Sequence, residues 1–124
     1  MSVSASLPSS LRSTLPGHYY ADPAVFALEQ ARIFEATWFA VARSADLASP
    51  GSFRTADVGR ESVIVIRGRD GALRAFLNVC RHRGAKVAQG CGRARLFVCP
   101  YHAWSYNLSG QVMGIPKGSP FRYR

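Results

Sequence analysis

Two cysteines and two histidines occupy positions from which they could bind a metal together. Cys80 and His82 form a C-x-H pair, and Cys99 and His102 form a C-x-x-H pair after sixteen intervening residues. Each pair directly follows an apolar segment typical of a strand. A tight turn after a strand can point two side chains at one place, and two such turns can face each other. Thiolate together with imidazole selects zinc or an iron–sulfur centre rather than magnesium or calcium.

Two kinds of metal centre compete for this donor set. A mononuclear Cys₂His₂ zinc site uses the same four side chains, but its usual spacing pairs two cysteines in one turn and two histidines in the other. Here each turn holds one cysteine and one histidine. The mixed arrangement favours a two-iron cluster in which both cysteines bind one iron and both histidines bind the other. Zinc remains the alternative.

The segments that must position these side chains have the pattern of short strands. Residues 61–67 (ESVIVIR) form the clearest strand, apolar enough for burial on both faces. Asp70-Gly71 is a hairpin signal, and residues 73–79 form the returning strand. Other β-rich segments cover residues 38–42, 52–58, 96–98, 105–106 and 112–115. Strands at this spacing predict an antiparallel all-β domain.

One helix is expected ahead of the strands. Asp22-Pro23 matches an N-cap followed by proline at the first helical position, which predicts a helix over 23–36. Apolar side chains recur along it at Val25, Leu28, Ile33 and Phe34. We expect this face to pack on the sheet. The expected organisation is an N-terminal arm at 1–20, a helical lead-in at 21–37, the metal-binding domain at 38–116 and a tail at 117–124.

Charge is distributed unevenly along the chain. The sequence has 16 Lys and Arg against 7 Asp and Glu, a net charge of +9, and every acidic residue lies at or before Asp70. The excess of positive charge therefore belongs to the part that carries the Cys/His pairs, and this favours an anionic partner. Five of these cations lie in or beside the two predicted loops: Arg81, Arg83, Lys86, Arg93 and Arg95. A zinc-stabilised basic module that binds nucleic acid would also fit the charge, but no RNP-type aromatic motif supports it.

Length and composition narrow the class of protein. The 124 residues suit one domain, and no apolar run approaches the roughly 18 residues of a membrane span. The first ten residues lack the basic and apolar regions of a secretory signal. Three cysteines cannot form a closed disulfide set, so a reducing, cytoplasmic setting is expected.

The two motifs together resemble a known family. Residues 78–85 (NVCRHRGA) and 97–106 (FVCPYHAWSY) are similar to the cluster-binding motifs of Rieske non-heme iron oxygenases, in the N-terminal domain of the α subunit. The resemblance implies stacked small antiparallel sheets with two cluster-binding loops. It implies a Rieske [2Fe–2S] cluster, with Cys80 and Cys99 on one iron and His82 and His102 on the other.

The same resemblance implies a function in electron transfer. An NAD(P)H-dependent reductase, sometimes acting through a ferredoxin, would deliver electrons, and a catalytic oxygenase domain would receive them at a mononuclear Fe(II). Substrates in the family include aromatic rings and quaternary amines. Neither a nucleic acid nor a membrane is expected as a partner, and an oligomer is compatible with the family.

The chain departs from the family in one decisive respect. A mononuclear iron site needs two histidines and a carboxylate, but only His18 remains beyond the cluster motifs, and no carboxylate side chain follows Asp70. We therefore assign no catalytic residue and expect a fragment of a ring-hydroxylating or amine-oxidising α subunit. A stand-alone Rieske ferredoxin is the alternative, and the zinc module is a third.

Several residues near the motifs qualify the resemblance. High-potential Rieske proteins carry a bridging cysteine in each loop, but the matching positions here are Ala85 and Tyr101. Trp104 replaces a serine that would donate a hydroxyl to the cluster, so we expect that donor to be missing and the reduction potential to lie near the low end of the Rieske range. Cys91 is expected to be a small apolar residue in the connecting loop. Aromatic residues that could shield the cluster or pack in the core are Tyr101, Trp104 and Tyr106.

Overall fold

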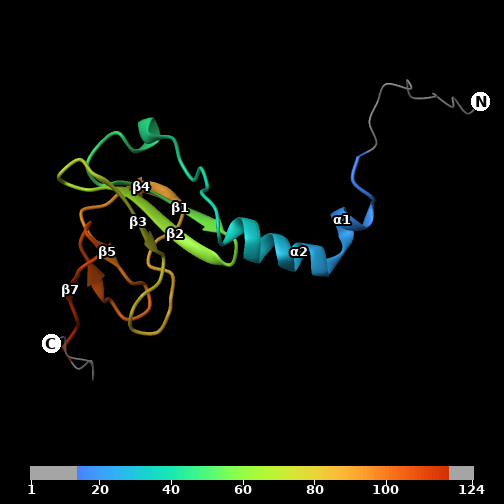
Figure 1. Ribbon diagram of the computed structural model, residues 1–124. Helices are drawn as coiled ribbons and strands as arrows, with labels where there is room; N and C mark the ends of the chain where they lie inside the picture. The colour runs from blue at the N-terminus through green and yellow to red at the C-terminus, as the bar shows by residue number, and fades with distance from the viewer. Residues whose placement is uncertain (1–13, 118–124) are drawn as a thin grey trace, which may run out of the picture.

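The computed structural model describes residues 14–117 and forms two small antiparallel sheets. The larger sheet has the strand order β3-β2-β1-β4 and the smaller one the order β5-β6-β7 (Figure 1). The strands are β1 (Ser52–Val58), β2 (Glu61–Arg67), β3 (Leu73–Leu77), β4 (Cys91–Arg93), β5 (Phe97–Val98), β6 (Ser105–Tyr106) and β7 (Val112–Gly114). The predicted fold of small antiparallel sheets is confirmed.

The β2–β3 hairpin forms where the sequence predicted it. β2 covers 61–67, and its residues Val63 and Arg67 pair with Leu77 and Leu73 of β3. The alternation of β2 buries Ile64 and leaves its neighbours half-buried, so only one face is fully covered. The expectation of burial on both faces was therefore too strong.

The two sheets pack together through the turn between β6 and β7. Gly110 has φ +81°, and a Cβ atom at this position would lie 2.8 Å from the ring of Phe76 on β3. Only glycine permits both the left-handed backbone and this close approach. The side chain of Asn107 holds the turn by accepting hydrogen bonds from the backbone N–H groups of Ser109 and Gln111, each at 2.9 Å.

Two strand predictions were wrong. Residues 38–42 form no strand, although their composition is β-rich, and they lead instead into the 3₁₀ helix η2 (Ser44–Leu47). Conversely, Cys91–Arg93 form edge strand β4, where Cys91 pairs with Arg54 of β1, rather than part of a loop. Tertiary pairing decides both cases, because strand propensity reflects the surface against which a segment packs.

The helix predicted over 23–36 begins at its predicted cap. A short helix, α1 (His18–Ala21), precedes α2 (Pro23–Glu29), and a π-helical turn, η1 (Gln30–Phe34), continues it. The carboxylate of Asp22 accepts a hydrogen bond from the backbone N–H of Ala24 at 2.8 Å. The arm predicted at 1–20 and the tail at 117–124 fall mostly outside the described residues.

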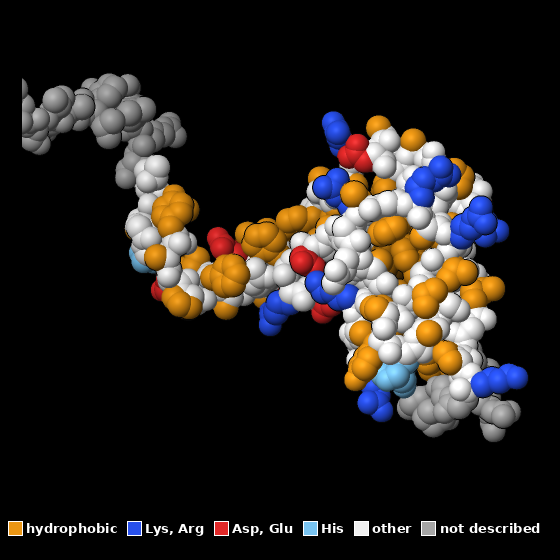
Figure 2. Space-filling model, turned by 180° about the vertical axis from the view of Figure 1, so that it is seen from behind, with side chains coloured by type: hydrophobic (Ala, Val, Ile, Leu, Met, Phe, Trp, Pro, Cys, Tyr) orange, Lys and Arg blue, Asp and Glu red, His pale blue; other side chains and the backbone are white. Residues whose placement is uncertain are grey.

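The predicted packing of the helix on the sheet was wrong. The helix extends away from the β domain (Figures 1 and 2), and Leu28 and Ile33 of the predicted face are 57% and 47% exposed. Val25 and Phe34 of the same face are half-buried. Its last turn meets the β domain at the β1–β2 turn, where Arg60 forms an ion pair with Glu35 at 2.7 Å. An amphipathic pattern shows that a face can be buried but not what covers it.

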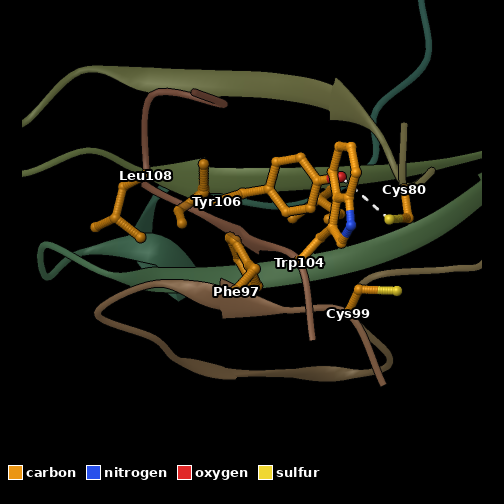
Figure 3. Packing of buried hydrophobic residues seen from close by; sticks show 8 residues of the cluster. Cys80, Phe97, Cys99, Trp104, Tyr106 and Leu108 are labelled. Atoms are coloured by element: carbon orange, nitrogen blue, oxygen red, sulfur yellow. Dashed lines mark hydrogen bonds between the residues drawn. The ribbon is translucent and has the colours of Figure 1, made fainter. Parts of the chain in front are cut away.

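The core lies between the two sheets and reaches directly to the predicted metal-binding residues (Figure 3). It contains one side of β2, the small sheet and both motif cysteines. Its buried members are Ile64, Ile66, Cys80, Phe97, Cys99, Trp104, Tyr106 and Leu108. The predicted site is therefore one end of the hydrophobic core rather than a surface feature.

Candidate metal centre

Two backbone turns carry the predicted ligands. In the loop between β3 and β4, the N–H of Cys80 donates to the carbonyl of Ala85 at 2.8 Å, and the N–H of Gly84 donates to the carbonyl of Cys80 at 2.9 Å. In the loop between β5 and β6, the N–H of Cys99 donates to the carbonyl of Trp104 at 2.8 Å. Each loop is thus closed by its own hydrogen bonds before any metal is considered. We call the first, residues 78–90, loop 1 and the second, residues 99–104, loop 2.

A buried asparagine anchors loop 1. Asn78 is 3% exposed, and its side-chain oxygen accepts from the backbone N–H groups of Val87 and Ala88 at 2.8 and 3.0 Å. Its amide nitrogen donates to the carbonyl of Ala88 at 2.8 Å. These bonds satisfy backbone groups that a loop would otherwise bury unpaired. An asparagine at the end of a strand is the one local feature that could have indicated this role.

The four predicted ligands lie as two pairs, with both cysteines in the core and the two histidines beside each other. Cys80 and Cys99 are each 2% exposed and neither is in a disulfide. The rings of His82 and His102 are half-buried and lie 4.5 Å apart, centroid to centroid. Like residues are therefore paired across the two loops, one member of each pair from each loop.

The donor set fits a Rieske cluster. The Nδ1 atoms of both imidazoles are buried, and that of His102 accepts no hydrogen bond within residues 14–117. A buried nitrogen of this kind needs a partner, and a metal ion can be that partner. In the same range, no three His, Cys, Asp or Glu side chains gather closely enough to hold a metal ion together. A two-iron cluster asks for two ligands on each iron.

A tyrosine hydroxyl supports Cys80, which the sequence analysis missed. The hydroxyl of Tyr106 lies 3.1 Å from the Cys80 sulfur and accepts the backbone N–H of Arg81 at 3.0 Å (Figure 3). Trp104 supplies no hydroxyl at the position of the missing serine, as expected, but Tyr106 brings a different hydroxyl to the site. The feature that could have indicated this role is an aromatic residue on β6, two positions after Trp104.

Burial and hydrogen bonding oppose each other at this thiol. Burial raises the pKa of Cys80, but hydrogen bonds from the Tyr106 hydroxyl and from the backbone of His82 outweigh it and hold the pKa below its ordinary value. Burial and the contact with Cys80 raise the pKa of Tyr106 to about 12. A Cys80 thiolate, the form that a metal requires, can only accept, so the Tyr106 hydroxyl would be the donor to it.

The surroundings of the histidines are aromatic. The indole of Trp104 is stacked on the His82 ring, with centroids 5.1 Å apart and planes within 1°. Tyr101 is 61% exposed and places its ring 3.9 Å from that of His102. Burial, and secondly the nearby His102, lowers the pKa of His82.

The remaining candidate residues lie away from the ligands or have other contacts. Cys91 is exposed on edge strand β4, and His18 belongs to helix α1. Lys86 forms an ion pair with Asp57 at 3.0 Å, and Arg93 donates to the Pro50 carbonyl. Of the five cations singled out, Arg81 and Arg83 are the two that flank His82 directly.

Comparison with known proteins identifies the class to which this centre belongs. Residues 37–123 match the family model of the Rieske [2Fe-2S] domain. The chain therefore belongs to the Rieske [2Fe-2S] domain family, and its cofactor is a Rieske [2Fe–2S] cluster.

The relatives are oxygenase subunits. The chain is 43% identical over 101 residues to the glycine betaine monooxygenase oxygenase subunit of Chromohalobacter salexigens, covering 81% of this chain and 23% of the relative. It is 41% identical over 100 residues to the carnitine monooxygenase oxygenase subunit of Escherichia coli, covering 80% and 27%. It is 34% identical over 98 residues to the chlorobenzene dioxygenase subunit alpha of Cupriavidus, covering 78% and 22%. The chain thus spans about a quarter of the length of these relatives.

Solved structures agree with this assignment. The quaternary ammonium Rieske monooxygenase CntA aligns with a TM-score of 0.80 and 38% identity, over 88% of this chain and 32% of that one. Naphthalene 1,2-dioxygenase aligns with a TM-score of 0.74 and 38% identity, over 79% and 22%. Within the described residues, no helix is long and apolar enough to cross a membrane.

Proposed function

We propose that this chain transfers one electron at a time as the Rieske domain of an oxygenase α subunit. Cys80 and Cys99 would hold one iron, and His82 and His102 would hold the other. The observation that carries the proposal is the pairing of two buried thiols and two imidazoles, like with like, across two loops. A Rieske cluster supplies reversible one-electron chemistry when bound.

The protein's own side chains prepare the site for that chemistry. Tyr106 donates to the Cys80 sulfur and so stabilises negative charge there. The half-buried histidines lie at the end of the β domain, and histidine and basic side chains reach the surface there (Figure 2). This places the exposed side of the centre where a second protein domain can approach it.

The metal content tests this proposal directly. The purified protein is expected to be red-brown, to contain two irons and two sulfides per chain, and to show a Rieske-type EPR signal once reduced. His102→Cys is expected to remove that signal, because a cysteine changes the donor set of one iron. The exposed His18 is the matched control, and His18→Cys should leave the spectrum unchanged. A colourless protein with one zinc per chain would overturn the proposal.

We propose that the whole oxygenase acts on a quaternary amine and that its oxygenation site lies outside this chain. Identity is higher to the glycine betaine and carnitine enzymes than to the chlorobenzene enzyme. Beyond the four cluster residues, only His18 remains for a mononuclear iron site that needs two histidines. The test supplies this domain within its full-length α subunit with betaine, carnitine and naphthalene. Product from naphthalene alone would contradict the assignment to a quaternary amine. If the natural protein proved to have no oxygenase domain and passed its electrons to another protein, the stand-alone ferredoxin would be favoured.

An acidic electron donor, a reductase or a ferredoxin, is the partner that fits the charge. Arg83 is exposed beside His82, whereas the charge of Lys86 is already paired with Asp57. We expect the rate of reduction by the donor to fall steeply with ionic strength, because salt screens exposed charges. Arg83→Gln should slow reduction at low salt by more than the control Lys86→Gln. A rate that is flat from 20 to 500 mM salt, roughly spanning Debye lengths of 20 to 4 Å, would remove the steering role.

A further inference from the structure

Apart from the stretch of chain between them, the two ligand-bearing loops are held together by noncovalent contacts. All three cysteines are free thiols, so no disulfide ties loop 1 to loop 2 among residues 14–117. Besides the ring contact between His82 and His102, two aromatic residues make contacts between them, one at the end of loop 2 and one on β6. Tyr106 reaches Cys80 and Arg81, and Trp104 reaches His82. The position of each loop 1 ligand therefore depends on an aromatic residue of the other segment.

Trp104 is held firmly enough to act on its neighbour. It is 5% exposed and belongs to the core, so the indole has no room to swing away. Its carbonyl accepts the Cys99 N–H at 2.8 Å, which fixes its backbone to the start of loop 2. Ala103, just before it, has φ +56° and is the one residue other than glycine with a positive φ in the described chain. A strained backbone of this kind persists only where the surrounding structure demands it.

The His82 ring lies between two neighbouring rings, those of Trp104 and His102. The indole and imidazole planes are parallel within 1° with centroids 5.1 Å apart, which is an offset stack, and His102 stands at 72° to the imidazole at 4.5 Å. Rotation of an imidazole about its last bond is soft, with two broad minima that exchange the positions of nitrogen and carbon. Trp104 on one face of the ring and His102 beside it restrict this rotation, and Nδ1 of His82 lies buried.

We propose that Trp104 is a positioning residue for His82, and that its stacked indole sets the orientation of this ligand and ties the two loops together. The inference rests on the proposed cluster-binding function. It differs from ordinary core packing in one respect: a packing residue contributes to the stability of the fold alone, whereas a positioning residue also affects how one particular histidine meets the metal.

The test compares two substitutions of Trp104 with a substitution of a control residue that is equally buried. Trp104→Leu removes the stack and Trp104→Phe keeps an aromatic face. Leu108→Ala is the control, because Leu108 is also 5% exposed but lies at the end of the core away from the two cysteines (Figure 3). Pulsed EPR of the reduced holoprotein reads the two histidine nitrogen couplings separately. Absorbance in the presence of a chelator reads the rate of cluster loss, at one fixed interval below each protein's own Tm.

In Trp104→Leu we expect one nitrogen coupling to change while the other is retained. We expect cluster loss to be roughly two- to tenfold faster than in Leu108→Ala, the range that an aromatic stack is worth. Trp104→Phe should stay within about twofold of the wild type by the same measure. Unchanged couplings in Trp104→Leu, with cluster loss equal to that of the control, would overturn the inference.

Failure to load the cluster is also decisive. If Trp104→Leu takes up no cluster while Trp104→Phe and Leu108→Ala load normally, the aromatic face is required and the inference stands. If Trp104→Phe also fails to load, the stack is not the cause and the inference falls. If the wild-type protein itself shows no Rieske signal, the proposed function fails instead, which is a separate result.

Discussion

At the scale of single residues, the centre depends on side chains that do not bind metal as much as on the four that are predicted to. Tyr106 donates to Cys80, Asn78 fixes the backbone of loop 1, and Trp104 covers His82. Polar and aromatic contacts of this kind orient metal ligands and tune the charge on them. The sequence motif alone indicates the candidate ligands and leaves these supporting residues unassigned.

The Tyr106 hydroxyl gives a prediction for the reduction potential. Tyr106→Phe keeps the ring but removes the donor to the Cys80 sulfur, and the more negative reduced state loses more from this than the oxidised one. A net hydrogen bond of about 0.5–1.5 kcal/mol corresponds to a fall of roughly 20–60 mV for one electron. A redox titration measures it. Tyr101→Phe is the control, because Tyr101 is exposed. The reduction potential of this variant should match that of the wild type. A rise in potential would contradict the role.

At the scale of elements, the turns define where the ligands lie. Loop 2 must reverse within a few residues to bring Trp104 back toward loop 1, and Ala103 adopts a left-handed backbone to do so. The β2–β3 hairpin is held similarly by local contacts, with Asp70 bridging Arg74 and the backbone N–H of Ala72. Both turns can be tested by substitutions that leave the ligands untouched.

Ala103 predicts a stabilising glycine. Alanine in the left-handed region is disfavoured by about 1–2 kcal/mol. Glycine avoids this cost, but it loses more conformational entropy on folding, which offsets part of the gain. Ala103→Gly is therefore expected to raise the free energy of unfolding by about 0.5–1 kcal/mol. Chemical denaturation measures the change. Ala48→Gly is the matched control, because Ala48 is exposed with φ −66°, and there glycine should destabilise. Destabilisation by both substitutions would mean that Ala103 carries no strain.

Asp70 gives a pH-dependent prediction. Hydrogen bonds from Arg74, and next from the Ala72 backbone, hold the pKa of Asp70 well below its ordinary value. A carboxyl with a lowered pKa stabilises the fold above its unfolded pKa, and this contribution disappears as the pH falls through the folded value. Asp70→Asn should lower Tm by a few degrees at pH 7, and the difference should shrink below about pH 4. Glu61→Gln, an exposed acid of the same sheet, is the control. A pH-independent difference would point to the turn geometry instead.

At the scale of the whole molecule, the chain divides into a β domain and a helical extension with few mutual contacts. The apolar side chains of the extension are exposed, with Phe26 at 58% and Trp38 fully exposed, while the β domain has its own core. The link between them is the Arg60–Glu35 ion pair and the close approach of η1 to Gly59. We therefore expect the β domain to hold the metal centre without help from the extension.

Removal of the extension tests this independence. Deletion of residues 1–36 should leave a folded protein that binds the cluster with an unchanged visible spectrum. An exposed ion pair is worth about 0–1 kcal/mol, so Tm should fall by no more than about 8 °C. Calorimetry of both holoproteins measures the difference. Loss of the cluster or of cooperative unfolding in the shortened protein would show that the extension supports the centre.

Sequence and tertiary structure each determined a different part of this protein. The two Cys/His motifs, the Asp22 cap, the β2–β3 hairpin and the strands at 52–58 and 105–106 could be predicted, because their signals are local. Strand β4, the exposure of the helix, and the contacts of Tyr106 with Cys80 and of Trp104 with His82 could not be predicted. These depend on which distant segments meet, and a residue's own neighbours in sequence do not encode that. The candidate ligand types could therefore be predicted from the sequence. The contacts that position these side chains and stabilise charge on them were set only by the packing of the two sheets.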